Sequence, residues 1–288
     1  MRNQEEIMGK TITTYEPDNS LKKGYMSVFG EIFSEIKENR WLTYQLFKRD
    51  FLGMYKQSFI GLLWVFIIPI ISVGTFIVLN QAGIFTIGDI NVPYPIYAVL
   101  GIAFWQLFSS GLVAGSNSLV KAGSMLIMIN FSKKSLVIAS MGLSAFSFLI
   151  QFILVALLFV FYGVAPSIAI LLLPIVIIPI LFFTLGLAFL LSLLNAVLRD
   201  IGNVLSLLMT FLMFLTPILY TKPKTGILTQ ITKYNPLYYM VSTVRDFILT
   251  GAITELTGFL ISTAIAFMIF VICLTLFHLT ETRISERI

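Results

Sequence analysis

Residues 135–198 read SLVIASMGLSAFSFLIQFILVALLFVFYGVAPSIAILLLPIVIIPILFFTLGLAFLLSLLNAVL and contain no charged side chain. These 64 residues are too many for one membrane-spanning helix, because about 20 residues cross a hydrocarbon core of about 30 Å. The tetrapeptide Gly163-Val164-Ala165-Pro166 interrupts the stretch with residues that favour a turn. The stretch therefore predicts two transmembrane helices, over residues 136–162 and 167–194.

Uncharged stretches on both sides of this pair are also long enough to cross a bilayer. They are residues 59–79, 94–118, 201–220 and 256–280. Across the whole chain 58% of the residues are hydrophobic and 11% are charged, whereas a soluble domain carries about 25% charged residues. A soluble protein of this composition could not cover its surface with polar groups. The sequence predicts an all-α polytopic membrane protein with six transmembrane helices.

The distribution of cationic residues predicts the orientation. If the N-terminus is cytoplasmic, the inner segments hold 15 of the 19 Lys and Arg residues and the outer segments hold four. Cytoplasmic loops carry the excess of Lys and Arg. We therefore expect both termini in the cytoplasm.

Two segments outside the spans have apolar faces at helical spacing. Residues 41–58 carry aromatic side chains every three or four positions, which is typical of a helix in the membrane interface. This segment is either a lipid anchor or a moving gate at the cytoplasmic mouth. Residues 235–251 have an apolar stripe with Arg245 off it, and Asn235-Pro236 gives a helix start signal. We expect a short re-entrant helix from the outer side, the alternative being a helix resting on the outer surface.

Catalytic and metal-binding patterns are missing from the sequence. The single cysteine, Cys273, excludes a disulfide within the chain, and His278 has no acids beside it that would favour a proton relay over a helix-end residue. Gly9-Lys10-Thr11 lacks the earlier glycine and the strand of a phosphate-binding loop. We expect a protein that is not an enzyme and binds no metal; if ATP powers it, the ATPase is another chain. Gly111 and Gly115 are spaced to let another helix approach closely, the alternative being ordinary glycine usage in membrane helices.

Four ordered motifs resemble the membrane subunits of ABC-2 type exporters of lipid-linked polysaccharides (O-antigen, capsule or teichoic acid). The first motif joins the interface helix to the first span, and the second lies in the second span and the segment after it. The third follows the fourth span, and the fourth opens the re-entrant helix. They comprise Lys48-Arg49-Asp50-Phe51, Tyr55, Ser58, Gly61, Leu63-Trp64 and Pro69; Tyr97, Gly101, Trp105, Phe108-Ser109-Ser110 and Asn117-Ser118-Leu119; Leu198-Arg199-Asp200-Ile201 and Thr216-Pro217-Ile218-Leu219-Tyr220; and Tyr234-Asn235-Pro236-Leu237 with Arg245-Asp246.

The resemblance implies one half of a homodimeric transmembrane unit above two copies of an ATPase subunit that binds ATP and Mg. The substrate would be a lipid-linked glycan moved through a conduit between the two copies. The chain departs from the family after the coupling segment, where a Phe-Pro pair is usual and Phe131-Ser132 stands here. Exporters of drugs or lipids with the same architecture are the alternative, and a channel or secondary carrier is a further one.

The resemblance also assigns roles to residues. The expected ATPase-coupling residues are Asn117, Ser118, Leu119, Lys121, Met125, Lys133 and Lys134. The expected gate helix uses Tyr44, Phe47, Arg49, Asp50, Phe51 and Tyr55, with Arg49 facing lipid or substrate phosphates. Conduit candidates are Trp64, Tyr97, Trp105, Phe108 and Tyr220; Arg199 and Asp200 are expected to fix a turn; and Asn235, Pro236 and Arg245 belong to the outer re-entrant helix. The expected organisation is a cytoplasmic extension over residues 1–40, an interface helix over 41–58, a six-helix domain over 59–280 and a cytoplasmic tail over 281–288.

Overall fold

The structure is a computed structural model, and it describes residues 6–7, 10–11, 25–56, 61–83, 88, 90–123 and 131–284. Apart from a pair of two-residue antiparallel strands, β1 (Glu6–Ile7) and β2 (Lys10–Thr11), every regular element of this part is a helix. The helices are α1 (Tyr25–Glu38), α2 (Arg40–Lys56), the 3₁₀ turn η1 (Gly61–Leu63), α3 (Trp64–Gln81), α4 (Tyr94–Ser116), α5 (Ser118–Ala122), α7 (Lys134–Tyr162), the 3₁₀ turn η2 (Ile168–Leu172), α8 (Leu173–Val176), α9 (Ile178–Val197), α10 (Asp200–Leu215), α11 (Ile227–Tyr234), α12 (Pro236–Thr250) and α13 (Leu256–Ile284).

Five helical segments of the described chain are long and apolar enough to cross a membrane. They are Trp64–Gln81, Tyr94–Ser116, Lys134–Tyr162, Ile168–Val197 and Leu256–Glu281. They correspond to the first, second, third, fourth and sixth predicted spans, so the prediction of a polytopic helical membrane protein is confirmed. The predicted turn between the third and fourth spans is also present, since Gly163 ends α7 in the left-handed conformation with φ at 64°.

The fifth predicted span is shorter than expected. Helix α10 covers Asp200–Leu215, 16 residues, which at about 1.5 Å per residue is less than the thickness of a hydrocarbon core. The helix stops because Thr216 precedes Pro217, and a residue before proline favours the extended conformation that Thr216 adopts. Residues 216–220 therefore leave the helix and become available for packing elsewhere.

Two expectations about the ends of the chain were incomplete. Part of the segment expected as an N-terminal extension forms α1, which ends only two residues before α2 begins. The last helix continues to Ile284, beyond the expected start of the tail at residue 281. Both α1 and the end of α13 carry residues of a buried polar cluster described below.

Helix α4 lies at the centre of the bundle and is buried along most of its length, whereas the other four candidate spans are mostly uncovered. Two glycines of α4 permit this packing. A Cβ on Gly111 would lie 2.7 Å from Met141 Sδ of α7, and one on Gly115 would lie 2.7 Å from Ala188 Cβ of α9. The prediction that Gly111 and Gly115 admit a neighbouring helix is confirmed, and two helices use the space.

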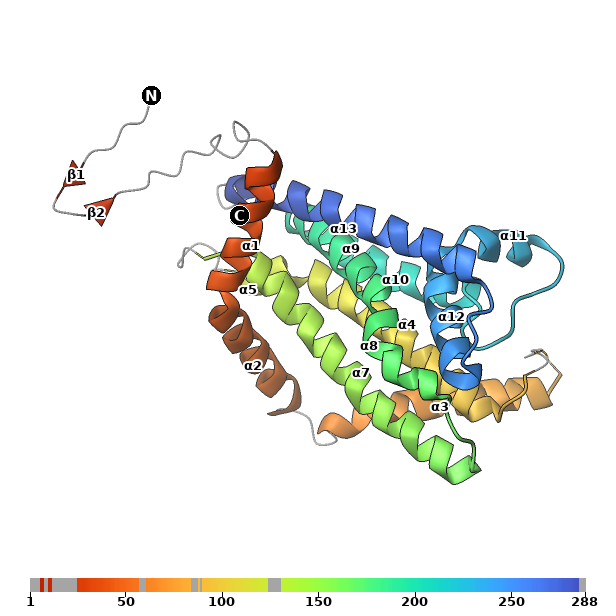
Figure 1. The fold of residues 1–288 in the computed structure, drawn as a ribbon. Coiled ribbons are helices and arrows are strands. Elements are labelled where there is room, and N and C mark those ends of the chain that lie inside the picture. Colours follow the sequence, from red (N-terminus) through yellow and green to blue (C-terminus); the bar gives the residue numbers. More distant parts are fainter. Residues whose placement is uncertain are drawn as a thin grey trace.

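The bundle has two distinct ends (Figure 1). Helices α1 and α2, the short α5 and the C-terminus lie at one end, here called the termini end, and α11 and α12 lie at the other, here called the far end. Helix α10 runs from the termini end to the far end, because Gly202 in its first turn contacts Asn195 and Thr216 after its last turn contacts Asn235. Helix α12 packs between α4, α13 and η2, so it does not simply rest on the surface.

Candidate functional site

Arg245 of α12 is the centre of a buried polar junction at the far end, although the sequence placed it off the apolar stripe. Its side chain is 3% exposed. The guanidinium carbon lies 3.6 Å from the centre of the Tyr97 ring of α4, and Nη1 donates a hydrogen bond of 2.8 Å to the carbonyl oxygen of Ile218. Arg245 thus holds the non-helical segment after α10 against α4, where both a cation–π contact and a charge-assisted hydrogen bond stabilise the contact.

Gly101 makes this junction possible. A Cβ at position 101 would lie 2.5 Å from the Ile218 carbonyl oxygen and 3.3 Å from Arg245 Nη1. Tyr97, one turn earlier on α4, donates its hydroxyl hydrogen to the Tyr220 carbonyl oxygen at 3.2 Å. Residues from the second, third and fourth sequence motifs therefore meet at one place.

Asn235 completes the junction from the start of α12. Its side-chain oxygen accepts a hydrogen bond from the Leu237 N–H at 3.0 Å, and its amide nitrogen donates to Thr216 Oγ1 at 2.9 Å. The predicted helix start at Asn235-Pro236 is confirmed, because Asn235 is the N-cap and Pro236 is the first helical residue. One amide side chain thus caps α12 and ties it to the end of α10.

Asp246 sits beside this buried cation. Its Oδ1 lies 3.9 Å from Arg245 Nε, which has no hydrogen-bond acceptor among the described residues. Burial raises the pKa of the Asp246 carboxyl, and Arg245 and the Thr254 hydroxyl oppose that shift. At this junction the Arg245 guanidinium group therefore contacts the Tyr97 ring, the Ile218 carbonyl oxygen and the Asp246 carboxyl group.

A second junction at the termini end depends on Asn195 of α9, which the sequence analysis missed. Its side chain is 1% exposed and donates hydrogen bonds to the Ser116 carbonyl oxygen at 3.1 Å and to Asn117 Oδ1 at 3.0 Å. Its own oxygen accepts from the Gly202 N–H at 3.0 Å. A polar amide within a long apolar run was the available signal, since buried polar groups in spans require partners.

The turn between α9 and α10 was expected to be fixed by Arg199 and Asp200, and this stays a prediction. Both residues are exposed, and no ion pair joins them among the described residues. Asn195 contacts the turn through Gly202. Asp200 lies in the first turn of α10, where its negative charge interacts favourably with the helix dipole.

The residues expected to couple to an ATPase have different surroundings. Asn117 and Ser118 lie at the junction just described, and Leu119 is 1% exposed, so its side chain is packed inside the chain. Lys121 is exposed on α5. Met125 lies outside the described residues. Only the exposed face of α5 therefore offers a surface to a partner among the described coupling residues.

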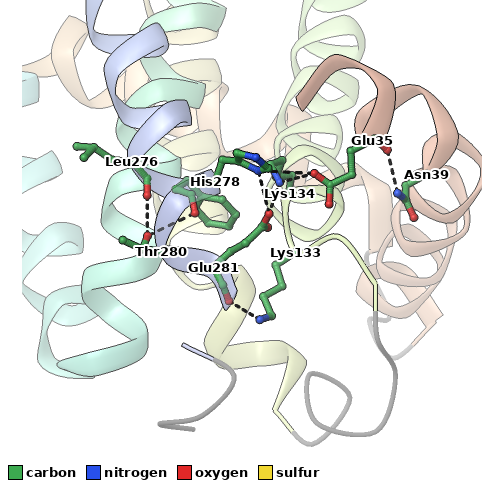
Figure 2. Close-up of polar contacts among 9 residues, drawn as sticks. Glu35, Asn39, Lys133, Lys134, Leu276, His278, Thr280 and Glu281 are labelled. Atoms are coloured by element: carbon green, nitrogen blue, oxygen red, sulfur yellow. Dashed lines mark hydrogen bonds and ion pairs between the residues drawn. The ribbon is translucent and has the colours of Figure 1, made fainter. Parts of the chain in front are cut away.

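Lys133 and Lys134 point into the protein instead, toward a cluster of ionisable side chains shown in Figure 2. Lys134, the first residue of α7, has no exposed side-chain surface and forms ion pairs with Glu35 of α1, at 2.7 Å, and with Glu281 of α13. Lys133 donates a hydrogen bond to the Glu281 carbonyl oxygen. Burial lowers the pKa of the Lys133 ammonium, and the Glu281 carboxylate opposes the shift. The cluster connects α1, α7 and α13.

His278 belongs to the same cluster, so the expectation that it lacks nearby acids was wrong. Its Nδ1 lies 3.3 Å from Glu281 Oε1 and 3.7 Å from Glu35 Oε2. Glu281 follows His278 by three residues, which places both on one helical face, and this spacing was visible in the sequence. Glu35, His278 and Glu281 each offer one possible metal-ligand atom, and these atoms lie within 4.8 Å of one another. The Lys134 ammonium bonds both carboxylates, so a cation of the chain already occupies the position between them.

The expected gate helix α2 packs on α7 through part of its aromatic stripe. The Phe47 ring lies against Gly142, and the Phe51 ring meets Phe146 edge-on with centroids 4.7 Å apart. Tyr44 is 57% exposed, so the stripe is not buried as a unit. Arg49 pairs with the adjacent Asp50 at 2.8 Å, in an exposed position. The side chain of Tyr55 lies outside the described residues.

The aromatic residues expected along a conduit are mostly interior to one chain. Tyr97, Trp105 and Phe108 are each at most 5% exposed, and Tyr220 is half-buried. Trp64 is 44% exposed. Phe108 also borders an apolar groove of about 590 Å³ between α4, α9 and α10, which extends from Asp200 to Asn235.

Arg245→Ala is expected to loosen the far junction. The change removes the ring contact with Tyr97 and a hydrogen bond from a charged donor, which is worth about 1.5–3 kcal/mol. The apparent Tm of the purified protein in detergent should fall, while Lys224→Ala, which removes an exposed cation at the same end, should leave it unchanged. Equal Tm values for the two variants would contradict the assigned role of Arg245.

Asn195→Ala is expected to destabilise the turn between α9 and α10. It leaves the buried Gly202 N–H without its acceptor, at a cost of about 1–3 kcal/mol. The matched control is Asn203→Ala, because Asn203 is exposed one turn into α10. Thermal unfolding of both variants tests this, and an Asn203→Ala effect as large as that of Asn195→Ala would argue against it.

Lys134→Met is expected to release α1. Removing one partner of a buried ion pair costs about 3–5 kcal/mol, and here two carboxylates would lose their cation. Limited trypsin digestion at Arg40, the first residue of α2, should accelerate relative to the wild type. Lys121→Met removes an exposed lysine nearby and should not change the digestion; unchanged cleavage in Lys134→Met would show that the cluster does not hold α1.

Comparison with known proteins agrees with this architecture. The ABC-2 type transporter family matches residues 42–249. The chain is similar to an O-antigen export system permease protein RfbA of Myxococcus xanthus, with 27% identity over 187 residues, 65% of this chain and 70% of that protein. It is also similar to a protein of the same name from Klebsiella pneumoniae, with 26% identity over 245 residues, 83% of this chain and 91% of that protein. A second Klebsiella pneumoniae protein of that name matches with 26% identity over 251 residues. The chain belongs to the ABC-2 type transporter family as a membrane permease subunit, and the ATP that drives it is hydrolysed by a separate subunit.

Proposed function

We propose that this chain forms half of a homodimeric membrane unit that exports a lipid-linked polysaccharide, such as O-antigen, capsule or teichoic acid, across the bacterial inner membrane. The observation that carries the proposal is the similarity, over 83% of the chain, to permease proteins named for O-antigen export. Two copies of an ATP-binding subunit would dock at the termini end and bind ATP with Mg.

The proposed topology has six crossings with both termini in the cytoplasm. The distribution of 15 of 19 Lys and Arg residues on the inner side supports the orientation. The path of α10 supports a crossing by the fifth predicted span, because this helix carries the chain from the termini end to the far end although it is short. Residues 216–220 would complete the crossing inside the protein, which is where irregular backbone is tolerated within a membrane.

The proposed coupling route begins at the exposed face of α5. Lys121 and Val120 lie on that face, and α5 follows directly on Asn117, which is bonded to Asn195. Movement of the ATP-binding subunit against α5 would therefore reach α4, α9 and α10 through one hydrogen-bonded junction. In the same proposal α2 is the gate helix, and its Arg49–Asp50 pair would have to open before Arg49 could bind a phosphate.

Reconstitution tests the function. The chain and its ATP-binding subunit would be placed in vesicles whose lipid carries an undecaprenyl-pyrophosphate-linked glycan, and a lectin on the opposite side would report export. Lectin binding should rise only with ATP, and should be absent with an ATP-binding subunit that cannot hydrolyse ATP. ATP-dependent movement of a labelled phospholipid without any glycan export would favour an exporter of lipids or drugs; equal glycan movement without ATP would favour a channel or carrier.

A further inference from the structure

The uncovered face of α4 is polar. Between Ile96 and Ser116 the residues that are not buried are Gln106, Ser109, Ser110, Val113 and Ala114. Their spacing of three and four residues places them on one side of the helix. The aromatic residues on α4 that were expected to line a conduit point elsewhere, into the core. The side of α4 left open by its own chain therefore carries two serines and a glutamine.

Of the neighbouring helices, α10 exposes polar as well as apolar residues, among them Asn203, Ser206 and Thr210. The uncovered faces of α7 and α13 are mainly apolar, and their exposed side chains include Leu149, Ile153 and Leu157 on α7 and Phe267, Met268 and Ile272 on α13. Such faces suit lipid. Polar residues within a span are costly in lipid and instead face the protein interior or a water-filled cavity. The open face of α4 is therefore distinguished from the lipid-facing surface.

An amide pair lies on this face near the middle of α4. The Gln151 amide of α7 donates a hydrogen bond to Gln106 Oε1. Gln151 is 1% exposed, and its own Oε1 has no donor among the described residues. Gln106 is half-buried, and no hydrogen-bond acceptor for its amide N–H groups is found in the described part of the chain. The pair thus offers an unmatched acceptor and unmatched donors, which is the complement of a hydroxyl group.

We propose that this face of α4 lines the substrate path, and that the Gln106–Gln151 pair contacts the hydroxyl groups of the passing glycan. The inference rests on the proposed function, since it names the residues that contact the same substrate. A sugar hydroxyl both donates and accepts, so it can satisfy Gln151 Oε1 and the Gln106 amide after a rotation of the two side chains. A lipid tail can do neither.

Thiol accessibility tests the location of the face. The natural cysteine, Cys273, is first replaced by alanine, and single cysteines are placed at Ser110 and, as a lipid-facing control, at Leu149. In membranes holding the complex with the ATP-binding subunit, a water-soluble maleimide should label Ser110→Cys at least about tenfold faster than Leu149→Cys, because a thiol ionises and reacts only in water. Equal labelling would overturn the assignment.

Export tests the hydroxyl contact. Gln106→Leu and Gln151→Leu should each lower ATP-dependent glycan export, compared at equal complex yield, about three- to tenfold, which corresponds to one lost hydrogen bond. The matched control is Gln230→Leu, at an exposed glutamine of α11. If the wild type exports glycan and all three variants export it equally, the contact is wrong and the proposed function stands. If the wild type exports no glycan under ATP, the proposed function fails, while maleimide labelling still decides where the face lies.

Discussion

The architecture depends on how closely neighbouring elements approach α4. Three glycines of α4 permit this approach. The Ile218 backbone after α10 lies against Gly101, Met141 of α7 and Thr184 of α9 lie against Gly111, and Ala188 of α9 lies against Gly115. In a membrane, helix association relies on such close packing, because lipid is as apolar as the side chains it would release. Small residues on α4 therefore decide which helices gather around it and at what depth.

Inside this closely packed bundle, two backbone polar groups near the ends of α10 need hydrogen-bond partners, one carbonyl oxygen and one N–H group. At the far end, Arg245 satisfies the free carbonyl of Ile218, which exists because Pro217 ends α10. At the termini end, Asn195 satisfies the Gly202 N–H at the start of the same helix. Both ends of this 16-residue helix are thus held by single buried side chains from other helices.

The spans themselves could be predicted from the sequence, because long uncharged runs have few alternatives to a transmembrane helix. The start of α12 was also predictable, since Asn235-Pro236 acts through local geometry. The partners of buried polar residues could not be predicted, because Lys134 meets Glu35 across 99 positions and Arg245 meets Ile218 across 27. Leu119 and the aromatic residues of α4 were assigned to surfaces on the strength of resemblance, and burial within one chain places them inside. Two contacts did have a local signal in the sequence. Asn195 is a polar amide within a long apolar run, and Glu281 follows His278 by three residues. The expectations made for Arg199 and His278 did not use these signals.

The cluster around Lys134 has a consequence for the order in which the molecule is made. Lys134 and Glu35 are synthesised well before Glu281, which follows Lys134 by 147 positions. Until α13 is present, the Lys134 ammonium group has only one of its two carboxylate partners among the described residues, namely Glu35. Arrival of α13 supplies the second carboxylate together with His278 and closes the termini end. The buried cluster at the termini end can therefore be completed only after α13 has been made, although α1 and α7 precede it in the chain.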